Sequence, residues 1–194
     1  MKSPFTITLA ILYTTAIVWL GYGLLGVVPM FLFGFGFFGG LLIWLARPRT
    51  PAFATIRIPF YIALLFFVLH KLEERYLDFF PALSEITGVP VPDTNSLLVY
   101  LLYALAAAWL LIPLLLKFGS EFGHYLVWSF FTSMGVTELA HFVFPFFTGT
   151  PYGYFPGMAS TLLLAPGAWW GMWRLWQASS RYRPLSSADR RSGS

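Results

Sequence analysis

Two short polar stretches lie near the ends of apolar segments in this sequence, and they carry side chains that bind metals or transfer protons. The first contains His70, Glu73 and Glu74, and the second contains Glu138 and His141. Each stretch pairs an imidazole with a carboxylate three residues away, a spacing that places both side chains on one face of a helix. Because an ionisable group inside a membrane segment is costly and usually functional, we predict that the two stretches meet and hold a metal ion.

Two imidazoles with several carboxylates suit two kinds of metal chemistry. Zinc accepts histidine and carboxylate ligands, and a spare glutamate then serves as the general base for a metal-bound water. The Glu-x-x-His spacing on inward-facing helices is also found in di-iron and di-manganese centres. We expect the metal ligands to come from His70, Glu73, Glu138 and His141. Glu74 is expected to be a further ligand or the catalytic acid or base, a role for which Glu73 is the second candidate.

The same residues also have structural interpretations. The acids of the first stretch can be solvated at the membrane surface and paired with Lys71 or Arg75. The second stretch can form a structural hydrogen-bonded pair, or its histidine can cap helix carbonyls. Solvation at the surface does not explain Glu138 and His141, so the metal site is the favoured interpretation.

A further pair, Glu121 and His124, repeats the Glu-x-x-His spacing but is not expected to bind the metal. It precedes Glu138 by 17 residues, which corresponds to about 25 Å along a helix. The pair also lies beside Lys117, at the opposite end of its apolar segment. We interpret Glu121 as an acid at a helix N-terminus and His124 as an interfacial residue.

The composition is typical of a membrane protein. Hydrophobic residues make up 58% of the chain, charged residues make up 10%, and the mean hydropathy is +0.71, far from the balance of a soluble domain. The net charge of +4 is explained by membrane topology rather than by nucleic-acid binding. The sequence contains no cysteine, which excludes disulfides, thiolate metal sites and a cysteine nucleophile.

Six apolar segments approach the length of about 20 residues that a membrane-spanning helix needs. They cover residues 5–25, 27–46, 53–76, 95–117, 120–144 and 156–176. We interpret the first as an uncleaved membrane helix, and we expect the prolines within residues 77–94 to allow one short interfacial helix. The sequence therefore predicts an all-α polytopic bundle, with residues 1–176 as a single transmembrane domain and residues 177–194 as a disordered, basic, cytoplasmic tail.

The basic residues agree with a six-helix topology. They flank the segments on one side of the membrane: Lys2, Arg47, Arg49, Arg57, Lys117, Arg174 and the arginines of the tail. By the positive-inside rule, both termini are then cytoplasmic. The candidate ligands lie together at the extracytoplasmic ends of the third and fifth segments, where neighbouring acids can neutralise Lys71 and Arg75.

Several of these motifs follow one another in an order found in a known family. They are His70-x-x-Glu73-Glu74 ending an apolar helix, an aromatic and proline-containing loop, His141 in a later segment, and Tyr154-Phe155-Pro156-Gly157 opening a helix with Thr161 and Pro166. Together they cover residues 70–174 and resemble the HXXEE-domain family of small bacterial membrane proteins. The resemblance implies a metal-binding protein of a bacterial inner membrane with His70, Glu73, Glu74 and His141 at its site, whereas Glu138 rests on spacing alone.

Aromatic residues make up 20% of the chain and gather around the extracytoplasmic ends of the third, fifth and sixth segments. Most are expected to form the aromatic belt of a membrane interface, and a minority can line a pocket in which Tyr152 and Tyr154 offer hydroxyl donors. A metal under such a rim would meet a lipid or apolar small molecule arriving from the bilayer. We therefore predict an integral-membrane metalloenzyme acting on such a substrate, with zinc-type hydrolysis slightly favoured.

Other functions stay open at this point. The site can be the di-iron centre of a lipid oxidase or desaturase-type enzyme. His70 and His141 can be the axial ligands of a haem, although a haem does not require the neighbouring acids. Without a metal, the same side chains can transfer protons in a lipid isomerase. The protein can also be a non-catalytic subunit of a membrane complex or a homo-oligomer.

Overall fold

The computed structural model describes residues 2–47 and 52–180, and these residues form helices and connecting turns without any strand. Helix accounts for 83% of the structure. The four longest helices are α1 (Pro4–Leu25), α2 (Val27–Ala46), α3 (Phe53–Tyr76) and α8 (Met158–Ser180). The all-α prediction is therefore confirmed.

Shorter helices follow α3. The short helix predicted within residues 77–94 is α4 (Phe79–Thr87). The fourth apolar segment folds as α5 (Leu97–Ala107), a 3₁₀ turn η1 (Ala108–Leu111) and α6 (Ile112–Lys117) in direct succession. Pro113 lies near the start of α6, and because proline has no amide hydrogen, the regular α-helical ladder is interrupted just before it.

The fifth apolar segment forms the centre of the bundle. It begins as α7 (Glu121–Val136), tightens into the 3₁₀ helix η2 (Thr137–Phe142) and ends in the short η3 (Phe144–Phe147). Twelve of the 16 residues of α7 are buried, because α1, α2, α6 and α8 all pack against it. α7 is therefore surrounded mainly by other helices of the protein.

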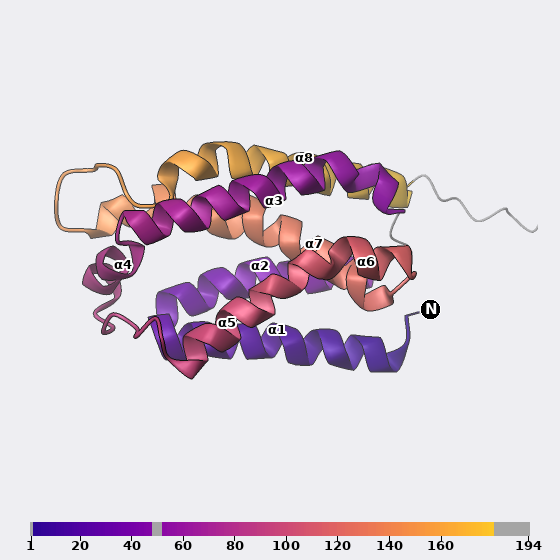
Figure 1. Ribbon diagram of the computed structural model, residues 1–194, viewed down its shortest axis with the longest axis horizontal. Helices are drawn as coiled ribbons and strands as arrows, with labels where there is room; N and C mark the ends of the chain where they lie inside the picture. Colours follow the sequence, from indigo (N-terminus) through magenta and orange to yellow (C-terminus); the bar gives the residue numbers. More distant parts are fainter. Residues whose placement is uncertain (1, 48–51, 181–194) are drawn as a thin grey trace, which may run out of the picture.

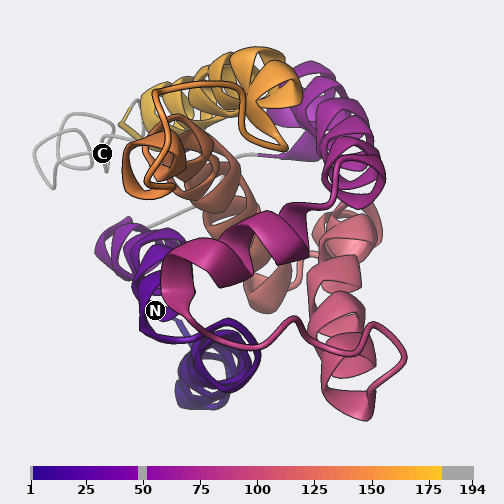
Figure 2. The same ribbon diagram turned by 90° about the vertical axis from the view of Figure 1, so that its left-hand side faces the viewer.

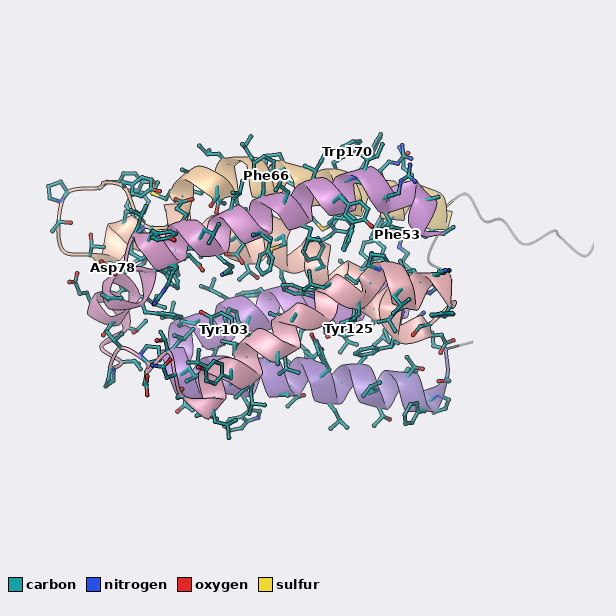
Figure 3. The ribbon with its side chains drawn as sticks, viewed as in Figure 1. Phe53, Phe66, Asp78, Tyr103, Tyr125 and Trp170 are labelled. Atoms are coloured by element: carbon teal, nitrogen blue, oxygen red, sulfur yellow. The ribbon has the colours of Figure 1, made fainter. Side chains whose placement is uncertain are left out.

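The long elements run along one axis and reverse direction from one to the next (Figure 1). α3 and α8 lie side by side in opposite directions, α1 and α2 form a second such pair, and α7 lies between the two pairs (Figure 2). The start of α1 and the end of α8 lie at one end of the bundle, and α4 crosses the other end. Asp78 and Tyr103 lie toward the α4 end, whereas Phe53 lies toward the opposite end (Figure 3).

Four helical segments are long and apolar enough to cross a membrane: α1, α2, α3 and the continuous stretch Leu97–Lys117. This finding is consistent with an integral membrane protein. α7 and α8 are helical where the fifth and sixth spans are predicted, but they are not among these four candidate spans. α7 has 16 residues, fewer than the ~20 that cross hydrocarbon. The count of six spans and the cytoplasmic position of the termini stay predictions.

Small residues bring α2 close to the junction of α7 and η2. A Cβ atom on Gly36 would lie 2.5 Å from both Ser133 Oγ and Thr137 Oγ1, so only glycine permits this approach, as at many interfaces of membrane helices. The Thr137 hydroxyl also donates a hydrogen bond to the Leu32 carbonyl at 3.0 Å. These contacts fix the place where the 3₁₀ helix η2 begins.

The boundary between the bundle and the predicted tail lies further along the chain than expected. α8 continues to Ser180 instead of ending at residue 176. The rest of the predicted tail, residues 181–194, lies outside the residues that the structure describes, as does Arg49 of the predicted cytoplasmic cluster.

Candidate metal centre

Four of the predicted ligands meet at the α4 end of the bundle: His70 and Glu74 from α3, and Glu138 and His141 from η2. On α3 the two residues are four positions apart and share one face of the helix. On η2, a 3₁₀ helix with three residues per turn, side chains at positions i and i+3 are eclipsed. The change from α-helix to 3₁₀ helix therefore points Glu138 and His141 in the same direction, toward α3.

The ligand atoms of these residues form a ring of short contacts. His70 Nε2 lies 3.1 Å from both Glu74 Oε1 and Glu138 Oε2. His141 Nε2 lies 3.5 Å and 3.3 Å from the same two oxygen atoms. A tetrahedral zinc ion with ligands at roughly 2.0–2.1 Å holds neighbouring ligand atoms about 3.3–3.4 Å apart. The four measured contacts are close to this spacing, and all four atoms lie within 4.8 Å of one another, so they can surround one ion.

The start of α8 holds the outer nitrogen of each imidazole. His141 Nδ1 lies 2.5 Å from the carbonyl oxygen of Pro156, which can only accept, so Nδ1 is the donor. His70 Nδ1 lies 2.9 Å from Ser160 Oγ. Because the Ser160 hydroxyl donates to the Gly157 carbonyl, Nδ1 of His70 is again the donor. Metal-binding histidines are held in this way, with the outer N–H donated to an oxygen acceptor.

The centre of the cluster collects hydrogen-bond acceptors. With Nδ1 protonated, each neutral imidazole presents a lone pair at Nε2, beside two carboxylates that also only accept. His70 Nε2 is buried and has no hydrogen-bond partner, although two carboxylate oxygens lie at 3.1 Å. Such a group of acceptors needs positive charge, either from a metal ion or from a second proton on each imidazole. The cluster can hold a metal ion.

The cluster is nearly closed to solvent. The side chains of His70 and His141 are 0% and 3% exposed, and those of Glu74 and Glu138 are each 11% exposed. The two carboxylates and His141 border a cavity of about 90 Å³. Access to the cluster is therefore from the side of the carboxylates.

Three phenylalanine rings cover His141. The ring centroids of Phe79, Phe144 and Phe155 lie 5.2, 5.8 and 6.1 Å from that of the imidazole. They come from α4, from η3 and from the turn before α8. This apolar wall lowers the local dielectric constant, which strengthens the attraction between the carboxylates and a bound cation.

Gly157 allows α8 to begin against both imidazoles. Its φ is +98°, a conformation that favours glycine. A Cβ atom there would overlap the His141 ring and lie 2.8 Å from His70 Cε1. The sequence pattern placed Gly157 only at the start of a helix and did not assign a function to Ser160. The sequence signal that could have indicated both roles is the Pro156-Gly157 pair before an apolar helix, with Ser160 three residues later.

Glu73 is expected from the sequence to be a ligand and the second catalytic candidate, but the structure does not bring it into the cluster. Its Oε1 accepts from the amides of Gly157 at 3.0 Å and Ala159 at 3.1 Å, and its Oε2 accepts from the amide of Ser160 at 2.8 Å. Successive helical residues point about 100° apart, so Glu73 faces α8 while Glu74 faces η2. A carboxylate at a helix N-terminus satisfies free amides and the helix dipole.

The two tyrosines predicted as donors at the site have other partners. Tyr154 donates a hydrogen bond to Glu73 Oε1, and Tyr152 donates to the Phe142 carbonyl at 3.2 Å. Burial of its hydroxyl and the adjacent Glu73 carboxylate raise the pKa of Tyr154 to about 12. Tyr154 therefore stays a donor at neutral pH and belongs to the cap of α8.

Lys71 joins the cluster from the open side. Its Nζ lies 2.6 Å from Glu74 Oε2, so one oxygen of Glu74 faces the ligand ring and the other faces an ammonium group. Its side chain is 38% exposed. The ion pair between Lys71 and a neighbouring acid, predicted above as an alternative to a metal site, is therefore present. It occurs together with the cluster of four ligands.

The Glu121 and His124 pair lies at the other end of α7, as predicted. Glu121 is in the first turn of that helix and its Oε2 accepts from the amide of Ser3 at 2.8 Å. Glu121 thus links the start of α7 to the start of α1, and neither residue of the pair belongs to the cluster of four ligands.

Comparison of the chain with protein-family models, with curated proteins and with solved structures finds no match in any of the three. The resemblance to the HXXEE-domain family therefore stays a prediction. The function has to be inferred from the site itself.

Proposed function

We propose that this protein is an integral-membrane, zinc-dependent hydrolase that acts on a lipid-like substrate. The observation that carries the proposal is the convergence of two imidazole nitrogens and two carboxylate oxygens at 3.1–3.5 Å, with His70 Nε2 buried and without a hydrogen bond. Histidine and carboxylate ligands suit zinc. Two of the ligands lie on α3, which is apolar and long enough to cross a membrane, and this position favours a lipid as the substrate.

Glu74 has the geometry of the acid–base residue in this proposal. A catalytic zinc site has three protein ligands and one open position, which requires one of the four residues to release the ion. Lys71 already holds the second oxygen of Glu74 at 2.6 Å, so Glu74 keeps a partner when its first oxygen leaves. With that oxygen free, Glu74 would accept a proton from the attacking water. Zinc supplies an acidic bound water and a polarised substrate carbonyl.

The ligand count favours one ion over two. Di-iron bundles take a glutamate from each of two helices and a Glu-x-x-His pair from each of two more. The cluster here offers two carboxylates, because Glu73 binds α8. A haem is also less well supported, since the carboxylates of Glu74 and Glu138 lie between the two imidazoles, where a porphyrin would have to pass.

Membership of the HXXEE-domain family, and with it a bacterial inner membrane as the location, is part of the proposal. Its support is that each residue of the His-x-x-Glu-Glu motif has a role. His70 and Glu74 belong to the ligand cluster, and Glu73 caps the helix that holds both imidazoles. The motif would then supply two metal ligands, His70 and Glu74, and the residue that positions the start of α8, Glu73.

The proposal is tested by incubating the purified protein with a bacterial lipid extract and measuring released fatty acids by mass spectrometry. Release should stop after chelation and return on addition of zinc. Glu74→Gln should lower the rate by about 10²–10⁴-fold, the usual contribution of an acid–base group. Glu85→Gln, on the exposed surface of α4, is the matched control and should retain the rate. Release that is indifferent to the chelator would overturn the proposal, because the hydrolysis would then proceed without the metal.

A further inference from the structure

Three cavities adjoin the metal cluster, and Lys71 and Tyr103 line all of them. The outer cavity, of about 680 Å³, lies between the end of α3, α4 and the loop that precedes α5. The small cavity of about 90 Å³ borders the ligands. The inner cavity, of about 300 Å³, lies between α3, α5 and α7. The cluster therefore stands where an outer and an inner space meet, toward the end of the bundle at which Figure 3 shows Tyr103.

The outer cavity is polar on its α3 side. Its lining includes four charged residues, Lys71, Glu74, Arg75 and Asp78, and the amide side chain of Asn95. α4 and the loop before α5, which border this cavity, lie at one end of the bundle (Figure 2). A cavity of this size and polarity fits the head group of an amphiphile.

The inner cavity is apolar over most of its length. On one wall Leu64 lies seven residues before Lys71, and on the opposite wall Leu110 lies seven residues after Tyr103. The cavity therefore extends about 10 Å along the helices from the junction, the place where the three cavities meet. The lining residues Val68 and Leu110 are 48% and 57% exposed at the bundle surface. An alkyl chain can therefore enter this cavity sideways, from the hydrocarbon of the bilayer.

The charges around the junction select the head group. The side chains around the junction carry two positive charges, from Lys71 and Arg75, and three negative charges, from Glu74, Glu138 and Asp78. Lys71 stays paired with Glu74 at 2.6 Å, and a divalent ion held by the cluster would leave the whole group with one excess positive charge beside an apolar cavity. Excess charge in such a place is costly, and an anionic group on the bound molecule would remove the cost.

We infer that the two larger cavities together bind a single-chain amphiphile with an anionic head group. The chain lies in the inner cavity between α3 and α5, the head lies in the outer cavity, and Lys71 and Tyr103 hold the link between them beside the cluster. This inference rests on the proposed function through the charge of the bound ion. It assigns the substrate class: a fatty acid derivative or a lysolipid-like anion with one chain.

The inference is tested with a fatty acid that carries a diazirine on its chain, photo-crosslinked to the zinc-loaded protein in lipid nanodiscs and mapped by mass spectrometry. We expect labelling of the inner cavity, at α5 residues such as Ala106 and Leu110. Ala106→Trp fills the cavity and should reduce this labelling more than tenfold. Ala104→Trp, on an exposed position of α5 outside the three cavities, is the matched control and should not change it.

Competition measures the charge preference. Dodecanoate should displace the probe at concentrations at least tenfold lower than dodecanol does, and Lys71→Met should remove this difference while the cavity is still labelled. Labelling spread evenly over lipid-facing residues, or equal competition by the acid and the alcohol in the wild-type protein, would overturn the inference. Zinc content is measured in every sample. Cavity labelling with the acid preference in a protein that binds no zinc would contradict the proposed function and leave the binding site standing.

Discussion

Replacing Glu73 by glutamine separates the roles of two adjacent acids. Glu73 accepts hydrogen bonds from the amides of Gly157, Ala159 and Ser160 and from the Tyr154 hydroxyl. Glutamine has almost the same shape but carries one acceptor and one donor. If its oxygen takes the place of Oε1, its NH₂ group faces the amide of Ser160, and two donors then oppose each other.

The magnitude follows from these contacts. A hydrogen bond to a charged group contributes about 1.5–3 kcal/mol, and the loss of a negative charge at a helix N-terminus costs a further ~0.3–1 kcal/mol. Glu73→Gln should therefore lower the free energy of unfolding by roughly 2–4 kcal/mol. For a domain of this size, 1 kcal/mol corresponds to about 2–4 °C, so we expect Tm to fall by roughly 5–15 °C.

The assay is thermal unfolding of the detergent-solubilised protein, with and without zinc, together with metal content at low temperature. Glu73→Gln should lower Tm by the same amount in both states and should keep its zinc, because its carboxylate does not contact the ion. Glu74→Gln should also keep zinc on the other three ligands, whereas Glu138→Gln, which alters the carboxylate that stays on the ion, is the matched variant and should lose it. Loss of zinc from Glu73→Gln with a zinc-free Tm equal to that of the wild-type protein would refute the capping role and make Glu73 a ligand.

Two further variants test the support of the histidines. Gly157→Ala should abolish zinc binding and lower Tm, because its Cβ would overlap the His141 ring and its φ is +98°. Metal content and thermal unfolding measure the two effects. Retention of zinc would contradict the close contact between Gly157 and the two imidazoles. Ser160→Ala removes the acceptor of His70 Nδ1 and should weaken zinc binding by about 10–100-fold, measured by competition with a chelator; Ser84→Ala on α4 is the control.

Much of the site could be predicted because its ligands follow helical spacing. His70 and Glu74 share a face on any α-helix, and Glu138 and His141 share one on an α-helix or, more closely, on the 3₁₀ helix that forms. The meeting of the two pairs required only that the third and fifth segments be neighbours with their polar ends at one depth.

The role of Glu73 could not be predicted in the same way. Residues three and four positions after His70 both lie near its face, and the sequence does not show which of them faces η2 and which faces α8. The choice depends on the position of α8, whose free amides at Gly157, Ala159 and Ser160 attract the first acid. That position is a property of tertiary packing.

The fifth apolar segment shows a similar limit for the fold. Hydrophobicity alone does not separate a helix that faces lipid from one that faces protein, since both are apolar. α7 is buried by its neighbours on nearly all sides, and close contacts such as that of Gly36 with Ser133 and Thr137 decide this. The helix was predicted, but its central place in the bundle was not.

The metal content of the purified protein, measured by elemental mass spectrometry alongside Glu138→Ala and Glu85→Ala, decides whether the cluster binds an ion. The four-ligand centre predicts about one zinc ion per chain in the wild-type protein and in Glu85→Ala, and none in Glu138→Ala. About two iron ions per chain would contradict a single-ion site, and no metal above background in a folded protein would contradict the metal centre altogether.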